Sequence, residues 1–96
     1  MYLIIYDIQK DHSRIKVSKH LEKEGYNRIQ LSVFIGTEDP NANSSLWSYL
    51  SDCCDENTDK LFVLSISSYL FKQMKYIGKL NWDIDFLLGE KKELFI

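Results

Sequence analysis

The sequence predicts an α+β fold in which two helices pack on one β-sheet. The N-terminal run over residues 2–8 is short and rich in Ile and Tyr, as is typical of a strand. Residues 28–35 alternate apolar and polar side chains, which predicts a second strand with one buried face. Residues 12–24 and 42–55 carry apolar side chains at helical spacing. Strands and helices that alternate in one short chain favour a small two-layer sandwich.

The length and composition indicate a single domain with its own core. The chain has 96 residues, of which 45% are hydrophobic. No apolar segment approaches the roughly 18 residues that span a bilayer, and Asp7 interrupts the N-terminal run too early for a signal peptide. Cys53 and Cys54 are adjacent, a spacing that strains a disulfide, so we expect them to be reduced. We therefore expect a cytoplasmic protein without membrane contact.

The charge is unevenly distributed along the chain. The net charge of −2 divides into +2 over residues 1–36, −6 over residues 37–59 and +2 over residues 60–96. A polyanion is expected to avoid the acidic middle block and to meet the N-terminal third. The chain as a whole lacks the strongly basic character that is typical of nucleic-acid-binding domains.

The segment between the first two predicted strands is expected to form an amphipathic helix. Asp11 or Ser13 is expected to be its N-cap, and Gly25 is expected to close its C-terminus. One stripe of this helix holds Arg14, Val17, Ser18 and Leu21, with Ile15 beside it, and the opposite face holds Lys16, Lys19 and Lys23.

The predicted second strand has two different faces. Its apolar face would carry Ile29, Leu31, Val33 and Ile35, and its other face Arg28, Gln30, Ser32 and Phe34, before Gly36 ends it.

The second half of the chain is expected to complete the sheet. The expected elements are a loop over residues 37–45, a helix over 42–55, strands over 61–67 and 74–77 with a helical turn over 68–73 between them, and a short terminal strand over 93–96. Two element orders remain open: strand-helix-strand-strand-helix-strand, or strand-helix-strand-helix-strand-strand. In both, helices cover one face of the sheet, and the apolar second face predicts a homodimer whose sheets pack against each other.

Asp7 is the first candidate for a functional residue. It follows a run of apolar side chains at the end of a predicted strand, where an acid is costly unless something pairs with it. Ends of strands are also where open sheets place reactive groups. A structural alternative is that Asp7 caps the turn into the next helix or pairs with a base there.

Two motifs about twenty residues apart carry a family resemblance. The first strand ends in Tyr6-Asp7-Ile8, and the later segment runs Arg28-Ile-Gln-Leu-Ser-Val-Phe-Ile-Gly36. Between them stand Asp11, Arg14, Lys16-Val17, Leu21 and Gly25. With these residues, positions 2–36 resemble the CRISPR-associated protein 2 family, and the remainder is similar in length and element order.

The resemblance implies a ferredoxin-like βαββαβ sandwich over residues 1–78 and a C-terminal tail with an extra strand over residues 79–96. It also implies a face-to-face homodimer in which the tail packs on the partner protomer. The family includes metal-dependent endonucleases and a CRISPR adaptation protein that bridges integrase subunits and foreign DNA during spacer acquisition. The alternatives are a non-catalytic DNA-binding scaffold and a toxin-like ribonuclease of the same fold.

The resemblance also assigns roles to individual residues. Asp7 is implied as the catalytic, metal-binding residue, with Mg²⁺ shared between the Asp7 carboxylates of two protomers. Arg14, Lys16 and Arg28 are implied as nucleic-acid-binding residues, and Phe34 as a residue that supports the site. Lys16 stands where the family often has arginine, which keeps the charge but loses the bidentate fork. The structural alternatives are a solvated helix face and a strand-end ion pair for the basic residues, and sheet packing for Phe34.

Overall fold

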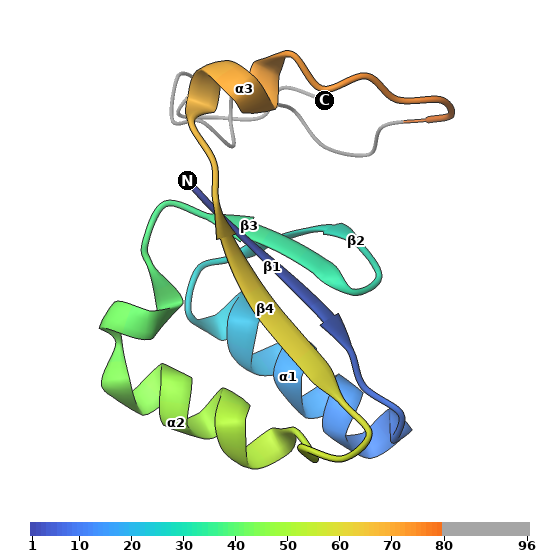
Figure 1. The fold of residues 1–96 in the computed structure, drawn as a ribbon, viewed down its shortest axis with the longest axis vertical. Helices are drawn as coiled ribbons and strands as arrows, with labels where there is room; N and C mark the ends of the chain where they lie inside the picture. The colour runs from blue at the N-terminus through green and yellow to red at the C-terminus, as the bar shows by residue number, and fades with distance from the viewer. Residues whose placement is uncertain (80–96) are drawn as a thin grey trace.

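Four antiparallel strands form one sheet with the spatial order β2-β3-β1-β4. The computed structural model describes residues 1–79 (Figure 1). The elements in chain order are β1 (Tyr2–Asp7), α1 (Asp11–Lys23), β2 (Asn27–Gln30), β3 (Val33–Gly36), a 3₁₀ turn (Pro40–Ala42), α2 (Ser44–Cys53), β4 (Lys60–Ser65) and α3 (Ser68–Lys72). This is the ferredoxin-like βαββαβ order, followed by α3. The predicted terminal strand over residues 93–96 and the tail from residue 80 lie outside the described residues.

The predicted strand over residues 28–35 is a hairpin of two strands, so that prediction was wrong. Leu31 and Ser32 form the turn between β2 and β3, and Leu31 is 81% exposed although the alternating pattern placed it on a buried face. The alternation of apolar and polar side chains continues across the turn because Leu31 is apolar. Neither glycine nor asparagine stands at the turn to mark it. The hairpin supplies the strand that the ferredoxin-like order needs, and it decides between the two orders that the sequence left open.

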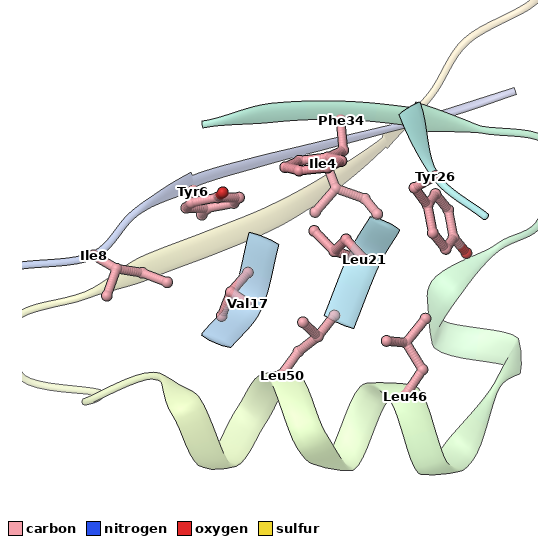
Figure 2. Close-up of a cluster of buried hydrophobic side chains, with 9 residues drawn as sticks. All are labelled: Ile4, Tyr6, Ile8, Val17, Leu21, Tyr26, Phe34, Leu46 and Leu50. Atoms are coloured by element: carbon pink, nitrogen blue, oxygen red, sulfur yellow. The ribbon is translucent and has the colours of Figure 1, made fainter. Parts of the chain in front are cut away.

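The core lies between the sheet and the two long helices. Figure 2 shows nine buried side chains that converge there from the strands, the helices and the residues next to them: Ile4, Tyr6, Ile8, Val17, Leu21, Tyr26, Phe34, Leu46 and Leu50. α1 and α2 cover this face of the sheet (Figure 1). The lysine-rich face of α1 is exposed, as predicted.

Helix ends differ in part from the predictions. The N-cap of α1 is Lys10, which makes no side-chain capping bond, so neither Asp11 nor Ser13 caps it. Gly25 closes the helix as predicted: its φ of 94° allows the Gly25 amide to donate to Glu22 and the Tyr26 amide to donate to Leu21. The predicted helix over residues 42–55 is shorter, because Asn43 caps α2 by accepting a hydrogen bond from the Leu46 amide.

The opposite face of the sheet is partly covered. α3, predicted as a helical turn over residues 68–73, places Phe71 against Ile35 beside Leu3 and Ile66. The prediction that helices cover only one face is therefore wrong at this end of the sheet. Residues 74–77, predicted as a strand, form none. Further along the same face, Phe62 and Leu64 of β4 are 53% and 52% exposed.

Gly36 is required because Tyr26 packs directly on its backbone. A Cβ atom at Gly36 would lie 2.4 Å from Cδ1 of Tyr26. The Tyr26 hydroxyl donates to the Glu38 carbonyl at 2.8 Å, which fixes the ring across the strand end. Burial, together with the nearby carboxylates of Glu38 and Asp39, raises the pKa of Tyr26 to about 12, so the phenol remains a donor at neutral pH.

Gly36→Ala is expected to lower the free energy of unfolding by about 1–3 kcal/mol, because the ring must move or the strand must bend. Urea unfolding of the two proteins measures the difference. The same substitution in a Tyr26→Ala background is expected to cost much less, because the clash is gone. Equal costs in the two backgrounds would show that the Tyr26 ring is not what excludes a side chain.

Candidate metal and nucleic-acid site

Asp7 ends β1 on the face of the sheet that α1 and α2 leave open. Side chains alternate along β1, so Ile4 and Tyr6 enter the core while Asp7 shares the open face with Leu3 and Ile5. Asp7 is exposed, and its partner in the strand register is Lys60 of β4. Among residues 1–79 no hydrogen bond or ion pair engages its carboxylate, so neither of the structural alternatives for Asp7, capping or pairing with a base, is formed there.

Whether a metal ion can bind at Asp7 depends on the side chains available to coordinate it. An exposed carboxylate without a protein partner is the hard oxygen ligand that Mg²⁺ prefers. Within the described part of the chain, no three His, Cys, Asp or Glu side chains are grouped as metal ligands. A single protomer therefore offers one carboxylate, and Mg²⁺ fits the site when a second copy supplies another or when waters and a phosphate complete the shell.

Arg14 and Arg28 meet in one open groove on the helix side of the sheet. Arg14 comes from α1 and Arg28 from β2, and the groove between them is lined by Tyr6, Arg14, Ile15, Ser18, Arg28, Leu31 and Ser32. The two guanidinium groups and the neighbouring hydroxyls are hydrogen-bond donors of the kind that bind a phosphate group.

Each arginine of the groove is held by contacts within the protein. Arg14 donates from Nη1 to the Ile8 carbonyl at 3.1 Å and forms an ion pair with Asp11. Arg28 lies 3.9 Å from the Glu22 carboxylate, measured from Nη1 to Oε1. Both arginine side chains are about two-fifths exposed, so these ion pairs are weak and a phosphate can compete with them.

Phe34 is entirely buried, so its predicted supporting role is indirect. The guanidinium carbon of Arg28 lies 5.1 Å from the centroid of the Phe34 ring, within cation–π range. Phe34 therefore packs in the core, as the structural alternative stated. Its ring supports the Arg28 guanidinium from the core side. Lys16 is exposed on α1 and is not among the residues that line the groove.

Tyr6 also lines this groove, and the sequence predicted no binding role for it. Its ring is buried, but its hydroxyl lies at the groove and donates weakly to the Leu31 carbonyl at 3.4 Å. Burial raises the pKa of Tyr6, and a hydrogen bond from Arg28 with the charges of both arginines opposes part of that rise. Tyr6 is therefore a neutral phenol beside two cations. In the sequence, the position of Tyr6 next to Asp7 in the Tyr-Asp-Ile motif was the one signal that could have pointed to a role for Tyr6 at the site.

The fold and this site define a ferredoxin-like α+β protein with a strand-end carboxylate and an arginine groove. The family described as CRISPR associated protein Cas2 matches residues 1–74 of the chain. A CRISPR-associated endoribonuclease Cas2 of Archaeoglobus fulgidus is 33% identical over 66 residues, covering 69% of this chain and 70% of that protein. One of Aeropyrum pernix is 33% identical over 64 residues, covering 67% and 70%. The chain therefore belongs to the CRISPR-associated Cas2 family.

Solved structures agree with the fold. A hypothetical protein of Thermus thermophilus superposes with a TM-score of 0.67 at 27% identity, covering 84% of this chain and 93% of that chain. Cas2 of Streptococcus pyogenes superposes with a TM-score of 0.66 at 22% identity, covering 80% and 98%. None of the helices within residues 1–79 has the length and apolar character needed to cross a membrane.

Proposed function

We propose that the protein is a Mg²⁺-dependent endonuclease that cleaves RNA as a homodimer. The observation that carries the proposal is the position of Asp7: an exposed carboxylate, unpaired among residues 1–79, at the end of β1 and one residue from the Ile8 carbonyl that Arg14 holds. The names of the two curated relatives, which are endoribonucleases, support RNA as the substrate.

The open face of the sheet supports the homodimer. Leu3 and Ile5 of β1 and the exposed Phe62 and Leu64 of β4 lie on that face together with Asp7. An exposed apolar patch of this kind favours a protein partner, and a second copy offers the same surface. Packing two sheets through this face would bring one Asp7 from each protomer toward the shared axis, where a cation offsets the repulsion between the two carboxylates.

Four residues of each protomer would have distinct roles in RNA cleavage. Asp7 of each protomer would hold the divalent cation, which supplies an activated water and neutralises charge on the scissile phosphate. Arg14 and Arg28 would bind backbone phosphates in the groove and set the register of the strand. Tyr6, kept neutral, would donate its hydroxyl to a phosphate oxygen beside the two arginines.

A second function is a non-catalytic scaffold that binds DNA and bridges integrase subunits during spacer acquisition. The observation that favours it is the single carboxylate: residues 1–79 gather no cluster of three metal-binding side chains, which is a small donor set for a nuclease. On this alternative, the arginine groove binds DNA and Asp7 has no role in cleavage.

Removal of the metal tests whether the protein is a metal-dependent endonuclease. Purified protein is expected to cut single-stranded RNA in Mg²⁺, to lose all cleavage in EDTA, and to recover when excess Mg²⁺ is restored, because one or two carboxylates hold the ion weakly. Product analysis on gels, with single-stranded DNA and duplex DNA run in parallel, also identifies the preferred substrate. Cleavage that survives EDTA would contradict the metal mechanism. Binding of duplex DNA without cleavage of any substrate would favour the scaffold.

A further inference from the structure

The turn that follows Asp7 is held from two sides by side chains distant in sequence. On one side, the Ile8 carbonyl accepts the hydrogen bond from Arg14, and the Ile8 side chain is buried in the core. On the other side, the Gln9 amide donates to Oδ1 of Asp59 at 3.0 Å, across 50 residues of chain. The backbone just beyond Asp7 is therefore tied to α1 by one bond and to the loop before β4 by the other.

Asp59 is itself tightly held within its loop. Its Oδ2 accepts from the Asp55 amide at 2.9 Å, and its Oδ1 also accepts from the Thr58 hydroxyl at 3.1 Å. The Asp59 amide donates to the Asp55 carbonyl at 2.8 Å, which closes the loop on itself. The hydrogen bonds from the Gln9 and Asp55 amides lower the pKa of Asp59, so its carboxylate remains charged at neutral pH and accepts strongly.

The position of Asp59 links this loop to Asp7 by a second route. Asp59 directly precedes Lys60, and Lys60 is the residue opposite Asp7 in the β1–β4 register. One carboxylate therefore fixes both the chain that leaves β1 beyond Asp7 and the chain that enters β4 opposite it. No other side chain in residues 1–79 accepts a hydrogen bond from the Gln9 amide.

We propose that Asp59 is a positioning residue for the metal site: it clamps the turn after β1 and so holds Asp7 where a divalent cation can bind. The proposal rests on the proposed function, since it concerns the same cation. A cation with few protein ligands depends strongly on preorganisation, because any freedom left in Asp7 has to be lost on binding. Loss of the clamp should weaken cation binding without changing which atoms coordinate the ion.

The experiment uses ¹⁵N-labelled protein and Mn²⁺ as the probe. Mn²⁺ broadens amide signals near its binding site, so the loss of the Asp7 and Ile8 signals during a titration reports the affinity without any activity assay. The exchange rate of the Gln9 amide proton, measured by NMR, reports the clamp directly. Asp59→Ala is expected to raise the Mn²⁺ concentration at half-broadening by about three- to tenfold and to speed Gln9 exchange by a similar factor, the range of one hydrogen bond.

Two further variants separate position from charge. Asp52→Ala removes an acid from α2 in the same acidic block, and the Asp52 side chain makes no hydrogen bond or ion pair within residues 1–79. It should change neither measurement. Asp59→Asn keeps one carbonyl oxygen, which can accept from Gln9 or from Asp55 but not from both. It should give values between those of the native protein and Asp59→Ala.

Three other outcomes would contradict the proposal. Unchanged Gln9 exchange in Asp59→Ala would overturn the clamp. Faster exchange with an unchanged Mn²⁺ midpoint would overturn the positioning role and leave Asp59 with a purely structural one. If the native protein shows no broadening at Asp7, the metal site of the proposed function is wrong and the positioning role is overturned with it, while Gln9 exchange still reports whether the clamp exists.

Discussion

Asp7→Ala is expected to lower Mg²⁺-dependent RNA cleavage by at least about a hundredfold. Asp7 is the residue proposed to hold the cation, and the charge stabilisation that a bound metal supplies is worth several kcal/mol, at about 1.4 kcal/mol per factor of ten in rate. Initial rates of cleavage at saturating Mg²⁺ measure the loss. Since the Asp7 side chain is exposed and bonds to nothing within residues 1–79, the melting temperature should change little.

Asp52→Ala is the matched control for this substitution, because it removes a carboxylate that is also exposed but lies on α2 and not at the end of β1. It should cleave RNA at the native rate. Nucleic-acid binding by Asp7→Ala should persist, because the arginine groove is intact. An Asp7→Ala protein that cleaves at more than about a tenth of the native rate would contradict the proposed role, since a lost metal ligand costs more than that.

The second large effect is expected from the Arg14→Ala/Arg28→Ala double substitution, which should weaken binding of single-stranded RNA by about ten- to a hundredfold near 0.15 M salt. Both side chains line one groove, and loss of two phosphate contacts should reduce the slope of log affinity against log salt by roughly 1.4. Fluorescence anisotropy with a labelled oligonucleotide at several salt concentrations measures both quantities.

Two further variants show whether the arginine groove or the net charge of the N-terminal third is responsible for RNA binding. Lys16→Ala removes a cation from α1 that is not among the groove residues, and it should weaken binding less than either arginine substitution alone. Arg14→Lys/Arg28→Lys keeps both charges but loses the planar forks, and it should recover only part of the affinity. If Lys16→Ala is as damaging as the double substitution, the N-terminal third binds by charge alone.

The sequence named candidate site residues but not the contacts that hold them in place. Asp7 stands out because a carboxylate ends an apolar run, and the basic residues stand out by type and motif. The contacts that Tyr6 and Asp59 make were not predicted. Tyr6 looks like a core aromatic because its ring is one, and only the position of its hydroxyl distinguishes it. Asp59 looks like one acid in a solvated acidic block, because its partner Gln9 lies 50 residues away.

Local patterns in the sequence determined β1, α1 and the end of α1. The apolar run of β1, the helical stripe of α1 and the glycine that ends α1 are local signals, set by side-chain alternation, helical spacing and backbone sterics. The tertiary structure alone decided that Leu31 and Ser32 form a turn, that α3 reaches the second face of the sheet, and which charged side chains meet. These choices depend on contacts between segments far apart in the chain, where burial and hydrogen-bond satisfaction outweigh local preference.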